Sequence, residues 1–228
     1  MNSHPHSWTL ASTGIPAEFS RELLEVGAMN GFAIRQPGLD LVVDRAEALE
    51  RLRPLHLELQ AQLGLASRRL CLAEQVHGSE VGVAGPGSPE WFPGADALLT
   101  NDPGVCLGIY VADCCALYLV DPDRRAIGLI HSGAKGTRLG IVPKTIQRMT
   151  QEYGSRPQSL LAVLSPCIRP PAYDVDFAAE IRSQCLELGV GRISDCGICT
   201  GVEMDRYYSY RREAGKTGRM LALLALSV

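Results

Sequence analysis

The chain has 228 residues, of which 46% are hydrophobic, so it can bury a sizeable core as one large domain or two small ones. Its formal net charge of −3 leaves no basic excess for a phosphate backbone, and we expect no nucleic-acid partner. No apolar run is long enough for a membrane span and no secretion signal is visible, so we expect a cytoplasmic protein without membrane contact. In that compartment the eight cysteines are expected to be buried residues, metal ligands or nucleophiles.

The predicted elements alternate between helix and strand. Residues 17–29 suggest a helix or a mixed opening element, and leucines at helical spacing predict a helix over 44–63 that Pro54 should kink or split. Further helices are expected over 135–153, with Ile141, Ile146 and Met149 inward, and over 176–189. Strands are expected over 68–76, 80–85, 95–101, 105–121 with a break near Asp113, 126–133, 159–167 and 220–228, with a loop over 88–95. This alternation indicates an α/β or α+β domain, although it does not determine the sheet topology.

Three chemically reactive side chains stand at the ends of hydrophobic strands: His77, Cys114 and His131. Strand ends that lead into glycine turns are places where side chains converge on a cleft. Two imidazoles and one thiolate would make a zinc site with an open fourth position, and Asp113 would orient a ligand or accept a proton. The same residues are compatible with a Cys/His nucleophile pair or with an ordinary core. Because side chains alternate along a strand, Cys115 is expected to point into the core.

Seven short segments keep the order and spacing of a known family. They are QVHG (75–78), GADALLT (94–100), YVADCCALYLVD (110–121), HSGAKGT (131–137), SPCIRPPAYDV (165–175), CT (199–200) and YYSYRRE…TGR (207–219). Together they resemble the YfiH/laccase-domain family, also described as multicopper polyphenol oxidoreductases or purine nucleoside phosphorylases. The match runs from about residue 68 to the C-terminus, and residues 1–67 are divergent. The resemblance implies a single four-layer α/β/β/α domain, with two mixed sheets flanked by helices and Zn²⁺ held by His77, Cys114 and His131.

The resemblance also implies an activity. Family members are described as phosphorolysing adenosine, inosine and methylthioadenosine and as deaminating adenosine, so the expected partners are a purine nucleoside and phosphate. The predicted start of the 135–153 helix would offer phosphate a cation and backbone N–H groups. We therefore expect catalytic roles for Asp113, Lys135 and Arg211, and substrate-binding roles for Gly133, Gly136, Thr137, Tyr173, Ser209 and Arg212.

Departures from the family pattern keep other functions open. HSGAKG stands where the family usually has HAGWRG, so Ala134 replaces a tryptophan and Lys135 an arginine. Ala116 and Ala172 replace a proline and a cysteine. One alternative is a copper-binding polyphenol oxidase, although five histidines are too few for a separate copper cluster. The others are a Cys/His hydrolase and a non-catalytic zinc-binding relative. The oligomeric state is left open, a monomer included.

Overall fold

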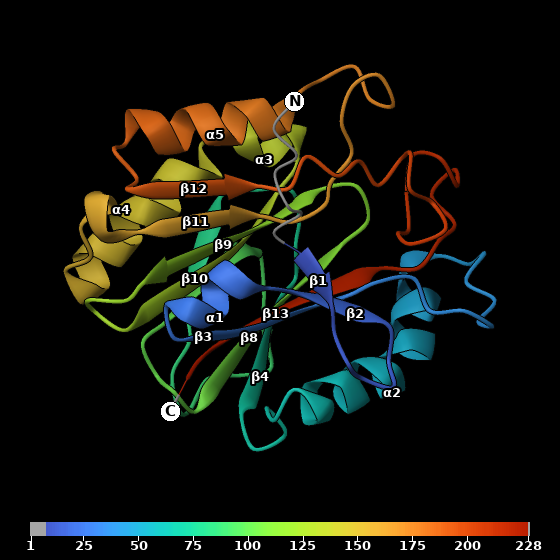
Figure 1. Ribbon diagram of the computed structural model, residues 1–228, viewed down its shortest axis with the longest axis horizontal. Coiled ribbons are helices and arrows are strands. Elements are labelled where there is room, and N and C mark those ends of the chain that lie inside the picture. The colour runs from blue at the N-terminus through green and yellow to red at the C-terminus, as the bar shows by residue number, and fades with distance from the viewer. Residues whose placement is uncertain (1–7, 228) are drawn as a thin grey trace.

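The computed structural model describes residues 8–227 and consists of two β-sheets packed face to face between helices (Figure 1). The seven-stranded sheet has the order β1-β2-β3-β13-β8-β4-β6, and the six-stranded sheet has the order β12-β11-β9-β10-β7-β5. Both sheets are mixed, because the first contains the parallel pair β4–β8 and the second the parallel pair β11–β12. The first sheet contains β1 (Trp8–Leu10), β2 (Ala17–Ser20), β3 (Ala28–Ala33), β4 (Arg69–Ala73), β6 (Trp91–Phe92), β8 (Val105–Val111) and β13 (Met220–Leu226). The second contains β5 (Glu80–Val83), β7 (Ala95–Thr100), β9 (Cys115–Asp121), β10 (Ala126–Ser132), β11 (Leu161–Leu164) and β12 (Arg192–Asp195).

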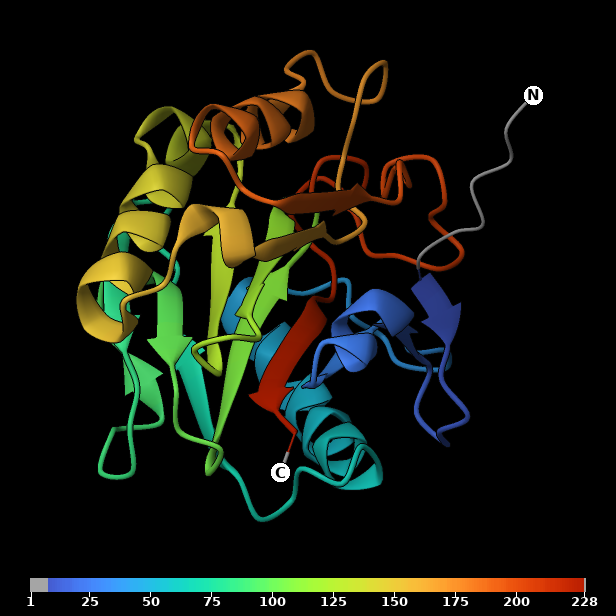
Figure 2. The ribbon, with the colours of Figure 1, turned by 60° about the vertical axis from the view of Figure 1, so that its left-hand side comes forward.

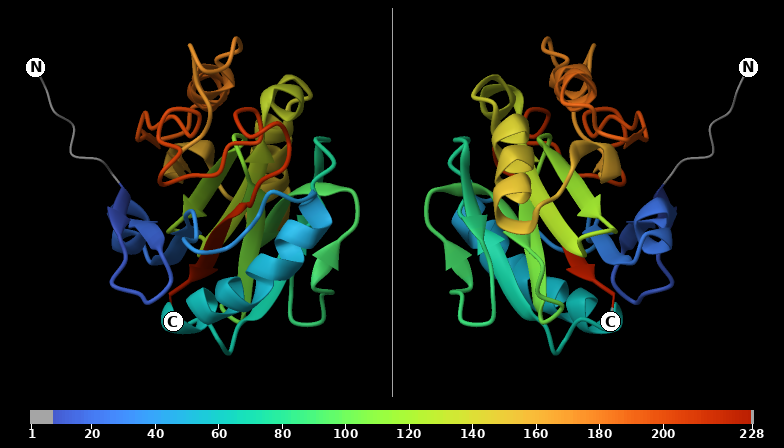
Figure 3. Two further views of the ribbon diagram at one scale, coloured as in Figure 1. Left: turned by 90° about the vertical axis from the view of Figure 1, so that its right-hand side faces the viewer. Right: turned by 90° about the vertical axis from the view of Figure 1, so that its left-hand side faces the viewer.

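The helices cover the outer faces of the two sheets (Figures 1 and 3). The α2 helix (Arg45–Gln62) lies on the seven-stranded sheet, whereas α3 (Ala134–Arg138), α4 (Ile141–Tyr153) and α5 (Phe177–Glu187) lie on the other. The short α1 (Arg21–Glu25) and a 3-10 turn (Pro157–Ser159) complete the described elements. The observed order of layers is α/β/β/α, as the resemblance implies.

Strand alternation divides the core into three layers. On the central strand β13, Ala222 and Leu224 pack between the sheets, whereas Leu221 and Leu223 pack beneath α2. On β9 the same period of two sends Tyr118 to the inter-sheet layer. Its neighbours Cys115, Leu117 and Leu119 face α4 and α5. Strands buried on both faces account for the long apolar runs in the sequence, and the core position predicted for Cys115 is confirmed.

The α2 helix continues through Pro54, so the predicted split does not occur. Pro54 is exposed, so its ring does not disturb the face of the helix that packs on the sheet. Leu52 and Leu59 hold the helix on the sheet from its buried face. This is the longest described helix, and within residues 8–227 none combines the length and apolarity that a membrane span requires.

The helix predicted over 135–153 is two helices. Gly140 has φ of 75°, a left-handed conformation that ends α3 and precedes α4. Pro143 lies in the first turn of α4, where its missing N–H costs no hydrogen bond. The predicted inward residues Ile141, Ile146 and Met149 are buried. The consequence for the site is that the helix after His131 has only five residues.

Other boundaries follow the prediction with local differences. The long apolar run over 105–121 breaks around Asp113, as expected, and β4, β5 and β11 are shorter than expected. The opening segment is mixed, with β2, α1 and β3 in succession (Figure 2). The sequence analysis missed β1, β6 and β12, which have two to four residues each.

Candidate metal centre

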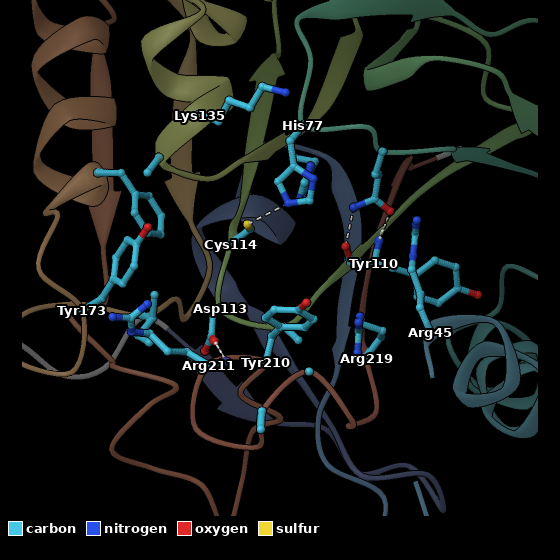
Figure 4. Close-up of a pocket in the computed structure, with 18 residues that line it drawn as sticks. Arg45, His77, Tyr110, Asp113, Cys114, Lys135, Tyr173, Tyr210, Arg211 and Arg219 are labelled. Carbon is cyan, nitrogen blue, oxygen red and sulfur yellow. Dashed lines mark hydrogen bonds between the residues drawn. The ribbon is translucent and has the colours of Figure 1, made fainter. Parts of the chain in front are cut away.

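Strand pairing in the six-stranded sheet brings two of the three predicted ligands together. The antiparallel pair β9–β10 places Cys115 opposite Ser132. Cys114, one residue before β9, therefore lies beside Gly133, and His131 lies next to them on β10. The third residue, His77, comes from the loop that crosses from β4 in one sheet to β5 in the other. Figure 4 shows His77 and Cys114 pointing toward each other at the cavity.

The three side chains form a compact donor set. Their ligand atoms all lie within 4.8 Å of one another, and Cys114 Sγ is 3.8 Å from His77 Nε2. Tetrahedral zinc with bonds of about 2.0–2.3 Å separates its ligand atoms by roughly 3.5 Å. One thiolate and two imidazoles suit Zn²⁺ and also Cu²⁺. The described residues therefore fit a metal ion with three protein ligands.

Asp96, at the start of β7, holds the donor set in place. Its Oδ1 lies 2.8 Å from Nδ1 of His131, which leaves Nε2 of that ring as the nitrogen available to a metal. The same carboxylate accepts the backbone N–H groups of Val76, His77 and Gly78 at 3.2, 2.9 and 2.6 Å. One buried side chain thus orients one ligand and fixes the loop that carries another.

The loop that carries His77 has an uncommon backbone. Gln75 and His77 have φ of 65° and 57°, a left-handed region that is uncommon for residues other than glycine. Besides the Asp96 contacts, the Gln75 side chain holds this loop, because its Oε1 accepts Tyr110 N–H at 2.9 Å and its Nε2 donates to Tyr110 O. The Gln75 amide thus hydrogen-bonds to the backbone of β8 beyond the point where β4 stops pairing with that strand. These contacts offset the strain that the two residues store.

Gly133 supplies the space that Cys114 needs. A Cβ at Gly133 would lie 2.4 Å from Cys114 Sγ, closer than any real contact. The backbone of Gly133 is extended, with φ of −108°, so its importance is steric rather than conformational. Any side chain here would push the thiol out of the donor set.

The charges around Cys114 favour its thiolate, which is the form that binds metal. Burial opposes ionisation of Cys114, but its interactions with the adjacent rings of His131 and His77 outweigh burial and lower the pKa of the thiol to about 6. Burial likewise opposes a charged His131, yet the Cys114 thiolate and the Asp96 carboxylate raise the pKa of that imidazole to about 9. Without a metal, the pair is a thiolate beside an imidazolium at neutral pH. A divalent cation would take the place of the imidazolium protons.

The donor set opens into a cavity of about 840 Å³. Lys135, Arg211 and Tyr173, three of the residues with an expected catalytic or substrate-binding role, line it. Arg211 stacks on Tyr173, with the guanidinium carbon 4.9 Å from the ring centre. Tyr173 in turn meets the edge of Phe177 at 6.1 Å. In Figure 4, Tyr173 and Arg211 lie on one side of Cys114, and Arg45 and Arg219 on the other.

Asp113 lines the cavity, but its carboxylate is already engaged. Oδ1 accepts the Thr200 hydroxyl at 2.8 Å, and Oδ2 accepts the Arg211 N–H at 2.7 Å. The backbone carbonyl accepts Ile168 N–H at 2.8 Å, so Asp113 joins three loops around the cavity. Its φ of 84° explains the break between β8 and β9. These contacts suit an architectural role.

Five further predicted residues do not line the cavity: Gly133, Gly136, Thr137, Ser209 and Arg212. Thr137 is buried, and both its N–H and its hydroxyl bond to Gly133 O. Ser209 is buried and accepts the Arg212 N–H at 3.3 Å. Of the phosphate site expected at the start of the 135–153 helix, Lys135 lines the cavity, whereas Gly133, Gly136 and Thr137 do not.

Asp96 and the groups on the opposite wall of the cavity were not predicted from the sequence. Asp96 stands in the quoted GADALLT segment, where an acid between apolar residues at a strand start was a usable signal. Arg219 ends the TGR segment, immediately before an apolar strand. Gln75 and Tyr110 begin the QVHG and YVADCCALYLVD segments, but neither they nor Arg45 were predicted to line a site, because only the packing of the two sheets brings them to the cavity.

The fold and the donor set define a class: a four-layer α/β domain with a His/Cys/His centre where its two sheets meet. The chain belongs to the family described as multi-copper polyphenol oxidoreductase laccase, whose model matches residues 38–180 and 174–227. The resemblance found in the sequence is therefore confirmed, and the match also includes part of the region that looked divergent.

Two named relatives and one solved structure are similar to the chain over most of its length. A Deinococcus radiodurans protein named purine nucleoside phosphorylase is 35% identical over 209 residues, 80% of each chain. A Corynebacterium glutamicum protein of the same name is 31% identical over 192 residues, 72% of this chain and 77% of the relative. The crystal structure of YlmD from Geobacillus stearothermophilus superposes with a TM-score of 0.83 at 25% identity, covering 98% of this chain and all of that one.

Proposed function

We propose that the protein is a metal-dependent purine nucleoside enzyme that transfers a ribosyl group from the purine to phosphate. The observation that carries this proposal is the position of the His77, Cys114 and His131 donor set. It lies in a cavity with an aromatic wall on one side and arginines on the other. A nucleoside needs a surface for its flat base, and phosphate needs cations. The names of the relatives support the same activity.

In this proposal each wall has a separate task. Tyr173 and Phe177 hold the purine and exclude water from it, and the Arg211 guanidinium stacked on Tyr173 stabilises negative charge on the leaving base. A phosphate oxygen forms the new bond to the ribose carbon as the bond to the purine nitrogen breaks. The purine keeps the bonding electrons and takes a proton from phosphate or water. Lys135, exposed at the cavity wall, attracts the phosphate.

The donor set would hold zinc in this proposal. A bound zinc ion supplies Lewis acidity that polarises an oxygen atom of a substrate or of water. Copper also accepts such ligands, but a laccase needs further copper ions with imidazole ligands. Within residues 8–227, one His/Cys/His group has metal-binding geometry. His4 and His6 lie outside the described residues. The chemistry of the donor set therefore favours zinc in a hydrolytic or group-transfer role.

Phosphorolysis is favoured over adenosine deamination by the acids of the cavity. Deamination requires a carboxylate that carries protons between water and the base. Among the described residues lining the cavity, Asp113 is the one acid, and both its oxygens hold loops together. The Asp96 carboxylate is likewise occupied, because it bonds to His131 and to three backbone N–H groups. Phosphorolysis needs no such shuttle.

A metal-free Cys/His hydrolase remains the second candidate, because Cys114 Sγ and His77 Nε2 are 3.8 Å apart. A non-catalytic relative is the third, because Ala134 stands where the family usually has tryptophan. The two predict different responses. A hydrolase would keep its activity after chelation, whereas a binding protein would show no turnover in any metal state.

The deciding experiment is a turnover screen of the zinc-loaded protein. Adenosine, inosine and methylthioadenosine are each incubated with and without phosphate, and the products are separated by chromatography. We expect free base and ribose 1-phosphate (or its methylthio analogue) in a phosphate-dependent reaction that Cys114→Ala abolishes. Inosine from adenosine without phosphate would establish deamination instead. No product above the Cys114→Ala background would contradict the enzymatic proposal.

A further inference from the structure

Arg219, just before β13, is a buried cation without an acidic partner. Its side chain is only 7% exposed. Nη1 donates to the carbonyls of Thr217 and Gly218 at 2.7 and 2.9 Å. Among residues 8–227 no carboxylate lies within 4 Å of its guanidinium, and its other N–H groups have no hydrogen-bond partner in the protein. Because arginine stays charged even when buried, this arrangement is costly unless an anion arrives from the cavity.

A second arginine faces the same part of the cavity. Arg45 begins α2, and its Nη2 donates to Glu74 O at 2.8 Å, again a carbonyl rather than a carboxylate. Burial lowers the pKa of the Arg219 guanidinium, and the positive charge of Arg45 lowers it further. Figure 4 shows the two side chains on the same side of the donor set. Two like charges thus lie near each other, and neither forms an ion pair with the described residues.

The neighbouring described residues form no ion pair with either arginine. Gln75 and Tyr110 are bonded to each other, so the Gln75 amide is occupied. The Tyr210 ring lies 5.7 Å from the Arg219 guanidinium carbon and covers it without adding negative charge. Asp113 is the nearest lining acid, and its oxygens bond to Thr200 and to the Arg211 amide. Arg45 and Arg219 therefore give this end of the cavity two positive charges with unused N–H donors, and the negative charges of Asp113 and Cys114 offset them only in part.

We propose that Arg45 and Arg219 form a binding subsite for inorganic phosphate, on the side of the metal centre away from Tyr173. The choice of phosphate rests on the proposed function, whereas the presence of an oxyanion site rests on the two guanidinium groups alone. Planar guanidinium groups match the edges of tetrahedral oxyanions and bind them through paired N–H donors. With the base against Tyr173, phosphate at this subsite lies on the opposite side of the ribose, as displacement of the base requires. Lys135 then attracts phosphate into the cavity, and Arg45 and Arg219 hold it there.

The test is calorimetric titration of the zinc-loaded protein with inorganic phosphate at constant ionic strength. The informative variants are Arg45→Gln, which alters an exposed side chain, and Arg219→Lys, which keeps the charge and loses the planar fork. Arg138→Gln is the matched control, because it removes one exposed arginine of α3 that does not line the cavity. We expect the phosphate dissociation constant to rise about tenfold or more in each of the first two variants and to stay unchanged in the control. Circular dichroism verifies that each variant is folded.

The outcomes separate this subsite from the proposed function. Phosphate binding that depends on Arg45 and Arg219 without nucleoside turnover would support the subsite and contradict the phosphorylase. Turnover whose phosphate KM is unchanged in both variants would overturn the subsite and leave the phosphorylase standing. Phosphate binding that is lost only in Lys135→Gln would also overturn the subsite.

Discussion

The Asp96 carboxylate lies 2.8 Å from Nδ1 of His131, and its two oxygens also accept the N–H groups of the loop that carries His77. These contacts connect the start of β7 to one predicted ligand on β10 and to another in the loop between β4 and β5. Donor geometry is consequently set by an acid that is not itself a ligand. Outer groups of this kind fix the orientation of metal ligands and raise their basicity.

Asp96→Asn is expected to weaken zinc binding by about 10- to 100-fold. The asparagine amide has one acceptor oxygen, so its NH₂ group must face either the His131 N–H or the backbone N–H groups that Asp96 accepts. Competition with a chromophoric zinc chelator measures the affinity. Asp205→Asn makes the same chemical change at an exposed position and should leave the affinity unaltered. Equal zinc affinity in Asp96→Asn and the wild type would show that Asp96 does not tune the centre.

Zinc binding should depend on Cys114 and not on its neighbour Cys115. The wild type is expected to bind about one zinc per chain, Cys114→Ala none, and Cys115→Ala as much as the wild type. Cys115 packs against the helices of the six-stranded sheet, so its loss costs about 1 kcal/mol of unfolding free energy but no ligand. Plasma mass spectrometry of dialysed, untagged protein gives the metal content. Full zinc in Cys114→Ala would refute the three-ligand centre.

Gly133→Ala should remove metal binding for a steric reason, because the backbone of Gly133 is in a conformation that alanine also adopts. The added Cβ would lie 2.4 Å from Cys114 Sγ, so the thiol must move away from the two imidazoles. The matched control is Gly87→Ala, because a Cβ there meets no atom within 4 Å. Zinc content and thermal unfolding temperature are measured for both variants. If Gly133→Ala retains full zinc, the thiol position is less constrained than the packing indicates.

The fold was largely predictable because its elements are periodic. Alternating burial of apolar residues on β9 and β13 and the strand break at Asp113 are local properties of the chain. The division of the 135–153 helix was also locally encoded, by Gly140 with Pro143 three residues later. Short strands such as β6 and β12 carry too few residues for a pattern, and they form because a neighbouring strand offers hydrogen bonds.

The site was predictable for residues whose side-chain chemistry is distinctive. It was not predictable where the role of a residue depends on hydrogen-bond or ion-pair partners from distant parts of the chain. Two histidines and a cysteine at strand ends are conspicuous, and the structure brings them together. Asp113 looked like a catalytic acid, yet its partners Thr200 and Arg211 come from about 90 residues away and occupy its oxygens. An unpaired Arg219 is recognisable only once every neighbouring carboxylate is known.

Buried His56 should make the protein less stable in mild acid. Within the described residues neither ring nitrogen has a hydrogen-bond partner, and burial lowers the pKa of His56 from 6.5 to about 3. The unfolded chain therefore binds a proton between pH 6.5 and 3 that the folded chain does not. Its contribution to stability is complete above pH 6.5 and declines as the pH falls toward 3.

From pH 7.5 to 5.5 this term should reduce the free energy of unfolding by about 1.4 kcal/mol. In His56→Leu, which keeps an apolar group against Tyr110, that part of the decline should be absent. Urea unfolding of both proteins at the two pH values isolates the difference from other titrating groups. Parallel declines in the two proteins would mean that His56 is not buried as a neutral ring.

Metal-free protein should show a reactive Cys114 with an unusual pH profile. The adjacent imidazoles outweigh burial and lower the pKa of this thiol to about 6, so the thiolate fraction rises about tenfold from pH 5 to 7 and then levels off. Alkylation by iodoacetamide, followed by peptide mass spectrometry, should follow that curve after chelation. An ordinary thiol with a pKa of 9.0 would instead gain about a hundredfold over the same interval and continue to rise. Zinc should suppress the labelling by occupying the sulfur, and Cys114→Ser should abolish it. Rapid labelling that zinc leaves unchanged would favour the Cys/His nucleophile over the metal centre.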